Sequence, residues 1–199
     1  MDEIKSGYTR VSEILNIVPC SKKLDEQGRP IWEFPLQSID KDVLNRKCLI
    51  GTNVHKAINA WYMRDFYPLN PEEIGYIDSF NAWKDIVNLH CIESEIRLYD
   101  ESLKITGAID MLGTVQGSKN IILIDFKTSS VADPKKWPLQ AAFYHHLLTL
   151  NNFSVYENVI FLQLDKEGKM PKCHTYTIDK AMKTLMISTW NLYKYLTNK

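Results

Sequence analysis

The chain has 199 residues and no net formal charge, with 24 lysines and arginines against 24 aspartates and glutamates. Its hydrophobic fraction of 45% and charged fraction of 24% are ordinary for a globular domain. No apolar run is long enough to cross a membrane. The opening MDEIKSGYTR lacks the apolar core of a signal peptide, so we expect a cytoplasmic protein without a membrane partner. The neutral balance argues mildly against nucleic-acid binding, although cations bound to acidic residues would reverse the local field.

The cysteines are widely spaced and form no CxxC pair. In a cytosolic chain such residues are expected to be reduced thiols, and their spacing disfavours a structural zinc or iron–sulfur site. No repeat or long linker interrupts the sequence, so we predict one domain over residues 1–199. Its expected parts are N-terminal helices and an arm (1–50), a core (51–165), and a C-terminal strand and helix (166–199).

The first elements are predicted from helical spacing of apolar residues. Thr9 is expected to cap a short helix that Pro19 ends. Residues 20–37 are rich in turn formers and are expected to form a loop or arm. Further helices are predicted over 38–47, 51–67 and 71–89. His55 lies beside the apolar stripe of the second of these, where a histidine considered alone is more often structural than a ligand.

From residue 91 onward, apolar residues recur at every second position, which predicts strands over 91–100 and 103–115. On the first strand Glu93 and Glu95 share the face opposite the core. We interpret Glu93 as solvated. Glu95 is a candidate accessory residue, because its strand leads directly into the strand that carries Asp110.

The candidate catalytic residues follow on the next strand. The near-continuous apolar run IILIDF predicts a central strand covered on both faces. Asp125 and Lys127 stand two apart at its end, so they should project to the same side, beside Asp110. Charged groups at the end of a buried strand are costly unless they are paired. Two acids and a lysine at one sheet edge are typical of metal-dependent phosphodiester cleavage, and a purely structural ion pair is the alternative.

Prolines at 134 and 138 precede a predicted helix on which Gln140 and Tyr144 lie four apart. At this spacing both side chains can face a common ligand. A Gln and a Tyr four apart on a helix surface would not by themselves indicate a site. Lys135 and Lys136 could grip backbone phosphates, and a solvated pair is the commoner explanation. Strands over 156–164 and 173–178 and a final helix capped by Asp179 complete the prediction. The apolar face expected on that helix comprises Met182, Leu185, Met186, Trp190, Tyr193 and Leu196.

Four motifs together resemble the PD-(D/E)XK nuclease superfamily and, within it, the RecB-like exonucleases. They are GTNVH with His55, TGAID with Asp110, IDFKT with Asp125 and Lys127, and QAAFY with Gln140 and Tyr144, in the family's order over residues 51–144. The opening YTRVSEIL is similar to the short N-terminal helix of the phage and mitochondrial single-domain exonucleases of this group.

The resemblance implies an α/β fold with a central mixed β-sheet flanked by helices and a restriction-endonuclease-like core. It also implies that His55 is a metal ligand. The chain departs from the family pattern in having Ala108-Ile109, without a proline, before Asp110. Some relatives hold an iron–sulfur cluster through late clustered cysteines. Here only Cys173 follows Tyr144, so we expect no cluster.

The resulting hypothesis is a metal-dependent deoxyribonuclease, most simply an exonuclease of recombination, repair or phage DNA processing. His55, Asp110, Asp125 and the Phe126 backbone carbonyl would hold one or two Mg²⁺ or Mn²⁺ ions. Lys127 would orient water or stabilise negative charge, and Gln140 and Tyr144 would position the strand or the metal's water shell.

The expected partner is DNA, single- or double-stranded, with a homo-oligomer or a recombination protein as a further partner. Two alternatives stay open: a non-catalytic DNA-binding or assembly module, and a restriction-like or junction-resolving endonuclease.

Overall fold

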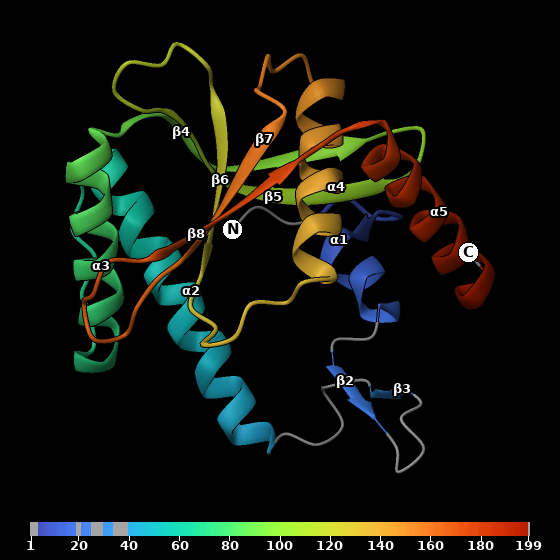
Figure 1. Ribbon diagram of the computed structural model, residues 1–199, viewed down its shortest axis with the longest axis horizontal. Helices are drawn as coiled ribbons and strands as arrows, with labels where there is room; N and C mark the ends of the chain where they lie inside the picture. The colour runs from blue at the N-terminus through green and yellow to red at the C-terminus, as the bar shows by residue number, and fades with distance from the viewer. Residues whose placement is uncertain (1–3, 19–20, 25–29, 34–39, 199) are drawn as a thin grey trace.

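The computed structural model describes residues 4–18, 21–24, 30–33 and 40–198. Within these ranges the chain forms a six-stranded sheet, a separate two-stranded sheet and helices (Figure 1). The elements are β1 (Thr9–Arg10), α1 (Val11–Ile14), η1 (Leu15–Ile17), β2 (Ser21–Leu24), β3 (Pro30–Glu33), α2 (Lys41–Met63), α3 (Pro71–Val87), β4 (His90–Asp100), β5 (Ile105–Thr114), β6 (Ile122–Lys127), α4 (Lys136–Leu150), β7 (Asn158–Gln163), β8 (Lys172–Thr177) and α5 (Lys180–Thr197).

The large sheet is mixed. Its order is β1-β5-β6-β7-β8, and β4 also pairs with β5. β5 runs antiparallel to β4 and β6 and parallel to β1, whereas β6 and β7 are parallel. A parallel pair needs a crossover, and α4 supplies it between β6 and β7. The mixed sheet flanked by helices agrees with the prediction.

Two apolar clusters pack on opposite faces of the sheet (Figure 1). One includes α1, α4 and α5, and the other includes α2 and α3. β6 contributes Leu123 to the first cluster and Ile124 and Phe126 to the second. Because both faces of β6 are covered, its sequence is apolar almost throughout. The charges at its end therefore lie next to the core.

Strands β5 and β6 separate at the two predicted acids. Their ladder pairs Gly113 with Ile122 and continues to Met111 opposite Ile124. One step further the register would bring Asp110 opposite Asp125, but the ladder ends there. On its other edge β6 continues to pair with β7 as far as Lys127. We call the point of separation the β5–β6 fork.

The N-terminal third differs from the prediction. Thr9 lies in β1 and pairs with Ile105, and Arg10 is the N-cap of α1 without a side-chain cap bond. The helices predicted over 38–47 and 51–67 form one helix, α2, which runs through Gly51. The predicted loop or arm over 20–37 contains the β2–β3 hairpin, and its remaining residues lie outside the described ranges.

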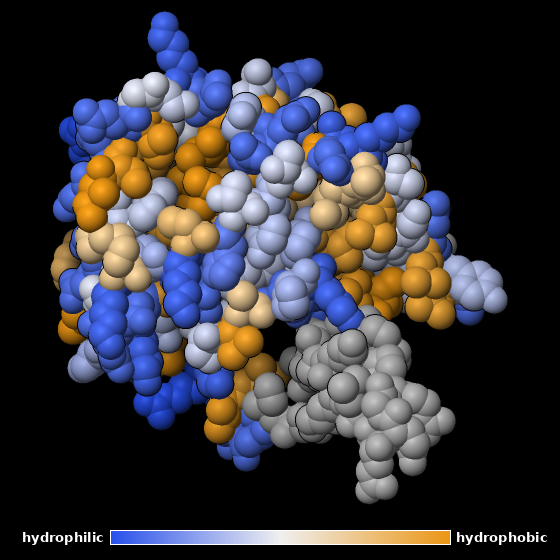
Figure 2. Space-filling view, viewed as in Figure 1, coloured by the Kyte–Doolittle hydropathy of each residue, from blue (hydrophilic) through white to orange (hydrophobic). Residues whose placement is uncertain are grey.

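The C-terminal helix buries a narrower face than predicted. Met186, Trp190 and Tyr193 are buried, but Leu185 and Leu196 are 50% and 57% exposed. Figure 2 shows apolar surface over this side of the molecule. Among the described helices, none combines the length and apolar character that a membrane span needs.

Candidate active site

The β5–β6 fork fixes the positions of the two central carboxylates. Asp110 and Asp125 are both buried. With the ladder ended, the Phe126 amide donates to Asp110 Oδ2 at 2.8 Å in place of a strand carbonyl. The Asp110 side chain thus bridges the separating strands and satisfies a buried donor. On the other side of β5, Ser94 Oγ donates to the Asp110 carbonyl at 3.0 Å.

Asp125 and Lys127 project together, as their spacing predicts. Lys127 Nζ lies 2.5 Å from Asp125 Oδ2 and donates to Gln140 Oε1 at 3.0 Å. Gln140 Nε2 is 3.3 Å from Asp125 Oδ1 and 3.0 Å from the Tyr144 hydroxyl. Gln140 on α4 therefore fixes the positions of both Asp125 and Lys127 on β6. The Lys127 ammonium also lies 4.7 Å from the centre of the Phe161 ring.

Gly107 explains how Tyr144 approaches the sheet so closely. A Cβ atom at position 107 would lie 2.8 Å from Tyr144 Cε1 and 2.9 Å from Leu147 Cδ1. Only glycine leaves room for this ring against β5. The glycine of the TGAID motif thus positions the tyrosine of the QAAFY motif, a link that sequence spacing alone did not reveal.

His55 closes the site from α2. Its Nδ1 lies 3.3 Å from Asp110 Oδ1 and 4.0 Å from Glu95 Oε1. Its Nε2 lies 3.1 Å from the Phe126 carbonyl oxygen, which can only accept, so this nitrogen carries a proton. The candidate ligand atoms of His55, Glu95 and Asp110 all lie within 4.8 Å of one another. Glu95 therefore lies among the candidate metal ligands, whereas the sequence suggested only an accessory role for it.

Glu95 reaches the site through an irregular backbone. Its φ angle is 54°, in the left-handed region that non-glycine residues seldom adopt. The neighbouring part of β5 is also irregular. Residues two apart in a strand normally point to the same face, but Ile109 belongs to one apolar cluster and Met111 to the other. This local distortion lets the Asp110 and Glu95 side chains both face His55. Strain of this kind is concentrated at functional sites.

The charges in the site are strongly coupled. Burial alone would lower the pKa of His55, but the Asp110 carboxylate raises it to about 9. His55 in return holds the pKa of Asp110 below its usual value despite burial. Burial raises the pKa of Asp125, and the nearby Asp110 charge adds to this rise. Burial also raises the pKa of Tyr144, which stays a neutral phenol.

These residues fit a divalent cation. Bonds of about 2.0–2.6 Å from a hard cation to oxygen allow ligand atoms within 4.8 Å of one another to share one ion. Asp125 Oδ2 is buried and makes no hydrogen bond of ordinary geometry, although Lys127 lies close to it. Two carboxylates that disfavour each other's charge would both be stabilised as anions by such an ion. The donor set of carboxylate, carbonyl and imidazole suits a divalent metal ion.

The predicted phosphate-gripping lysines lie beside this network at the start of α4. The backbone amides of Lys135 and Lys136 donate to Asp133 Oδ1 at 3.0 and 2.8 Å, which fixes the segment just before the helix. Lys136 and Gln140 line a common cavity of about 190 Å³ with Asn16. Lys136 is therefore next to the site through Gln140.

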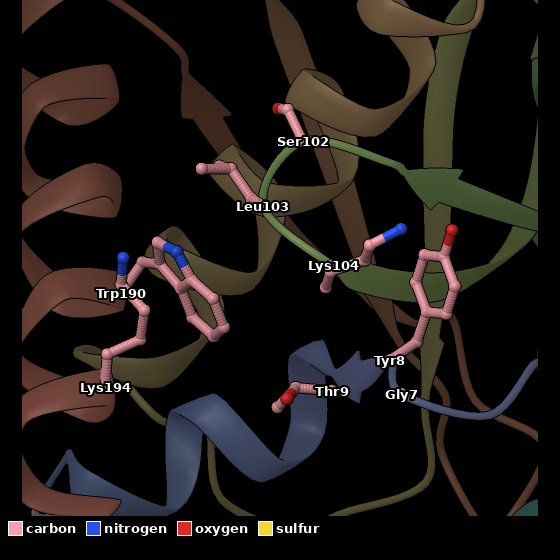
Figure 3. Close-up of a pocket in the computed structure, with 8 residues that line it drawn as sticks. All are labelled: Gly7, Tyr8, Thr9, Ser102, Leu103, Lys104, Trp190 and Lys194. Atoms are coloured by element: carbon pink, nitrogen blue, oxygen red, sulfur yellow. The ribbon is translucent and has the colours of Figure 1, made fainter. Parts of the chain in front are cut away.

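A larger cavity than the one beside Lys136 lies elsewhere in the molecule (Figure 3). It measures about 580 Å³ and is bounded by the start of β1, the β4–β5 turn and α5. Figure 3 shows Trp190 and Lys194 on one side and Tyr8 and Lys104 on the other. Ile105, at the start of β5, lies next to this cavity. Asp110 lies about 17 Å further along the same strand. The residues that line the cavity include none of His55, Glu95, Asp110 and Asp125, which we call the acid cluster.

Comparison with known proteins identifies the family. A model of the PD-(D/E)XK nuclease superfamily matches residues 75–181, a span that begins after His55 and includes Asp110, Asp125 and Lys127. No curated protein matches the sequence. Among solved structures, a Eubacterium rectale protein provisionally described as an exonuclease is similar with a TM-score of 0.53 and 9% identity, over 96% of this chain and 84% of that one. The crystal structure of SSO0001 gives a TM-score of 0.43 at 13% identity, over 96% and 78%.

The Eubacterium rectale similarity concerns the fold, because the sequences share so few residues. It agrees with the predicted α/β class, a mixed sheet flanked by helices with a restriction-endonuclease-like core. The family model covers more than half of the chain. The chain therefore belongs to the PD-(D/E)XK nuclease superfamily.

Proposed function

We propose that the protein is a Mg²⁺- or Mn²⁺-dependent deoxyribonuclease that degrades DNA from its ends. The observation that supports this most strongly is the β5–β6 fork, where two buried carboxylates meet the Lys127 amine, 2.5 Å from Asp125 Oδ2. A buried arrangement of this kind costs folding free energy unless it is fully compensated. Its location inside the nuclease family match supports a catalytic role.

Asp110, Asp125, His55 and the Phe126 carbonyl would hold one or two ions, and Glu95 lies close enough to join them. A bound ion supplies Lewis acidity, which lowers the pKa of water and neutralises charge on the phosphate. His55 has to lose its Nδ1 proton before that nitrogen can bind a metal. Contacts with Asp110 and Glu95 keep the Nδ1 side of the ring turned toward the other ligands.

Lys127 would orient the attacking water or stabilise negative charge as it develops on the phosphate. Gln140 fixes this amine: its amide nitrogen faces Asp125 and Tyr144, so its oxygen is left to accept from Lys127. Tyr144 is neutral and fixes the Gln140 amide in turn. Lys136, on the Gln140 side, would contact a backbone phosphate.

Action on DNA ends is supported by the fold shared with the provisionally described exonuclease. The same chemistry would serve an endonuclease, and a non-catalytic module would only bind DNA. A time course on end-labelled linear and circular single-stranded DNA, with Mg²⁺, Mn²⁺ or chelator, separates the three. We expect linear DNA to be shortened with either metal and circular DNA to stay intact. Cutting of the circle would indicate an endonuclease, and retardation on a gel without cleavage would indicate a binding module.

A further inference from the structure

A second pocket, lined by hydroxyl, lysine and apolar side chains, borders the candidate active site. It measures about 170 Å³ and lies where β6 and β7 end. The segment after β6 contributes Thr128, Ser129 and Ser130, and the β7–β8 turn and the start of β8 contribute Lys166 and Lys172. We call it the hydroxyl–lysine pocket. Figure 1 shows the β7–β8 turn lying against α3, which closes one side.

Strand register places this pocket beside the catalytic lysine. Lys127 pairs with Gln163 across β6 and β7, and Gln163 pairs with Lys172 across β7 and β8. Neighbouring strands are about 4.8 Å apart, so the backbones of Lys127 and Lys172 are about 10 Å apart. Thr128 follows Lys127 directly, and a Cβ at Gly51, one turn before His55, would lie 3.2 Å from Thr128 Oγ1. The pocket and the acid cluster thus share one sheet edge.

The wall of the pocket is held in place by hydrogen bonds. Gln163 Nε2 donates to the Ser129 carbonyl at 2.8 Å, and its Oε1 lies 3.0 Å from His174 Nε2. The Asp165 amide donates to Ser79 Oγ at 3.0 Å, which ties the β7–β8 turn to α3. A pocket with fixed walls needs little ordering when a ligand binds.

The chemistry of the pocket suits an anion. Lys166 and Lys172 form no ion pair with any residue in the described ranges. Glu167, whose pKa is lowered mainly by Lys169 and also by Lys166, is ion-paired to Lys169. Asp165, the acid among the lining residues, accepts the Glu167 amide at 2.8 Å within its own turn. Serine hydroxyls and lysine ammonium groups are common phosphate contacts in nucleic-acid complexes.

We propose that the hydroxyl–lysine pocket binds a backbone phosphate of the substrate strand next to the phosphate that is cleaved. This inference rests on the proposed function, because it assumes that the acid cluster acts on a nucleic-acid strand. The strand would then cross the sheet edge from the acid cluster toward β8, with Lys166 and Lys172 neutralising the phosphate that follows. The pocket would supply affinity without base readout.

The test measures binding without turnover. A short fluorescein-labelled oligothymidylate is titrated with protein in chelator, and affinity is read by fluorescence anisotropy over a series of salt concentrations. The Lys166→Ala/Lys172→Ala double variant should bind about tenfold more weakly, with a salt slope smaller in magnitude by about 0.7 for each lost phosphate contact. Ser130→Glu, which places a carboxylate in the pocket on an exposed residue, should weaken binding in the same direction.

A matched control removes the same charge from α5. The Lys180→Ala/Lys183→Ala double variant should keep wild-type affinity and slope, because neither lysine lines the pocket. Wild-type binding by the Lys166/Lys172 variant, or an equal loss in the control, would overturn the proposal. The assay needs no cleavage, so the two proposals can fail separately: binding through the pocket without any metal-dependent cleavage would refute the nuclease assignment alone.

Discussion

Asp110 links β5 to both β6 and α2. Its carboxylate accepts the Phe126 amide and faces His55. Asp110→Asn removes the charge but keeps an oxygen for the Phe126 amide. We expect this variant to fold and to bind Mn²⁺ at least about tenfold more weakly, as measured by titration calorimetry.

The control for Asp110→Asn is Asp85→Asn, which removes one exposed charge from α3. It should bind Mn²⁺ as the wild type does. Equal Mn²⁺ affinity in the Asp110 variant and the wild type would remove Asp110 from the ligand set.

Sequence reasoning reached much of the site at the residue level. The spacing of Asp125 and Lys127 on a strand was enough to put their side chains together, and the structure has them in contact. The place of Glu95 could not be derived in this way, because its positive φ angle leaves no trace in the alternation of polar and apolar residues. The closeness of Gly107 and Tyr144 likewise depends on how α4 packs on β5. The catalytic and ligand roles remain predictions.

Among the elements, α3 packs closely against the β7–β8 turn at Gly75. A Cβ at Gly75 would lie 1.9 Å from the Lys166 carbonyl oxygen, a backbone atom that cannot easily move aside. In an isolated helix, Gly→Ala stabilises by about 0.5–1 kcal/mol. Here the clash should win, and Gly75→Ala should lower the free energy of unfolding by about 1–3 kcal/mol in a urea titration.

A second consequence of Gly75→Ala would appear at the hydroxyl–lysine pocket, since the displaced turn carries Lys166. Oligonucleotide affinity should fall along with stability. An alanine variant more stable than the wild type would mean that helix propensity dominates and that α3 does not press on the turn.

The ends of helices and strands were predicted well where a single apolar period continues through the element. They were predicted poorly where contacts with other elements determine where an element begins and ends. The strands at 91–100 and 103–115 correspond to β4 and β5, which alternate over a long register. The helices predicted over 38–47 and 51–67 are one helix, α2, and its Gly51 allows the helix to approach Thr128 closely. β1 is two residues long and exists only through its pairing with β5, so no local pattern could reveal it.

For the whole molecule, a buried carboxylate at the end of β4 makes stability depend on pH. Asp100 is 1% exposed. Its Oδ1 accepts from the Ser102 amide at 2.8 Å, and its Oδ2 lies 2.7 Å from His146 Nε2. Burial alone would raise the pKa of Asp100, but these bonds to Ser102 and His146 lower it below the usual value.

A lowered carboxyl pKa contributes stability that is fully present above the unfolded-state pKa of about 3.9 and is lost as pH falls through the folded-state pKa. We therefore expect Asp100→Asn to be less stable than the wild type at pH 7 by about 1–3 kcal/mol. The difference should shrink below about pH 4. Urea unfolding at a series of pH values measures it, and a difference that stays constant down to pH 2 would contradict the linkage.

At the same scale, the mixed sheet could be anticipated only from the family resemblance, because strand order is not encoded in periodicity. The fork depends on that order: β6 has to pair with β7 on one edge while it leaves β5 on the other. The site is therefore a property of the topology as much as of its residues.

The central claim is that the amine at the fork takes part in metal-dependent cleavage. The most direct measurement is the single-turnover rate of linear DNA cleavage by Lys127→Ala at saturating Mn²⁺. We predict a loss of at least about 10²-fold with Mn²⁺ binding and fold unchanged. Cleavage by Lys127→Ala at the wild-type rate would contradict the account.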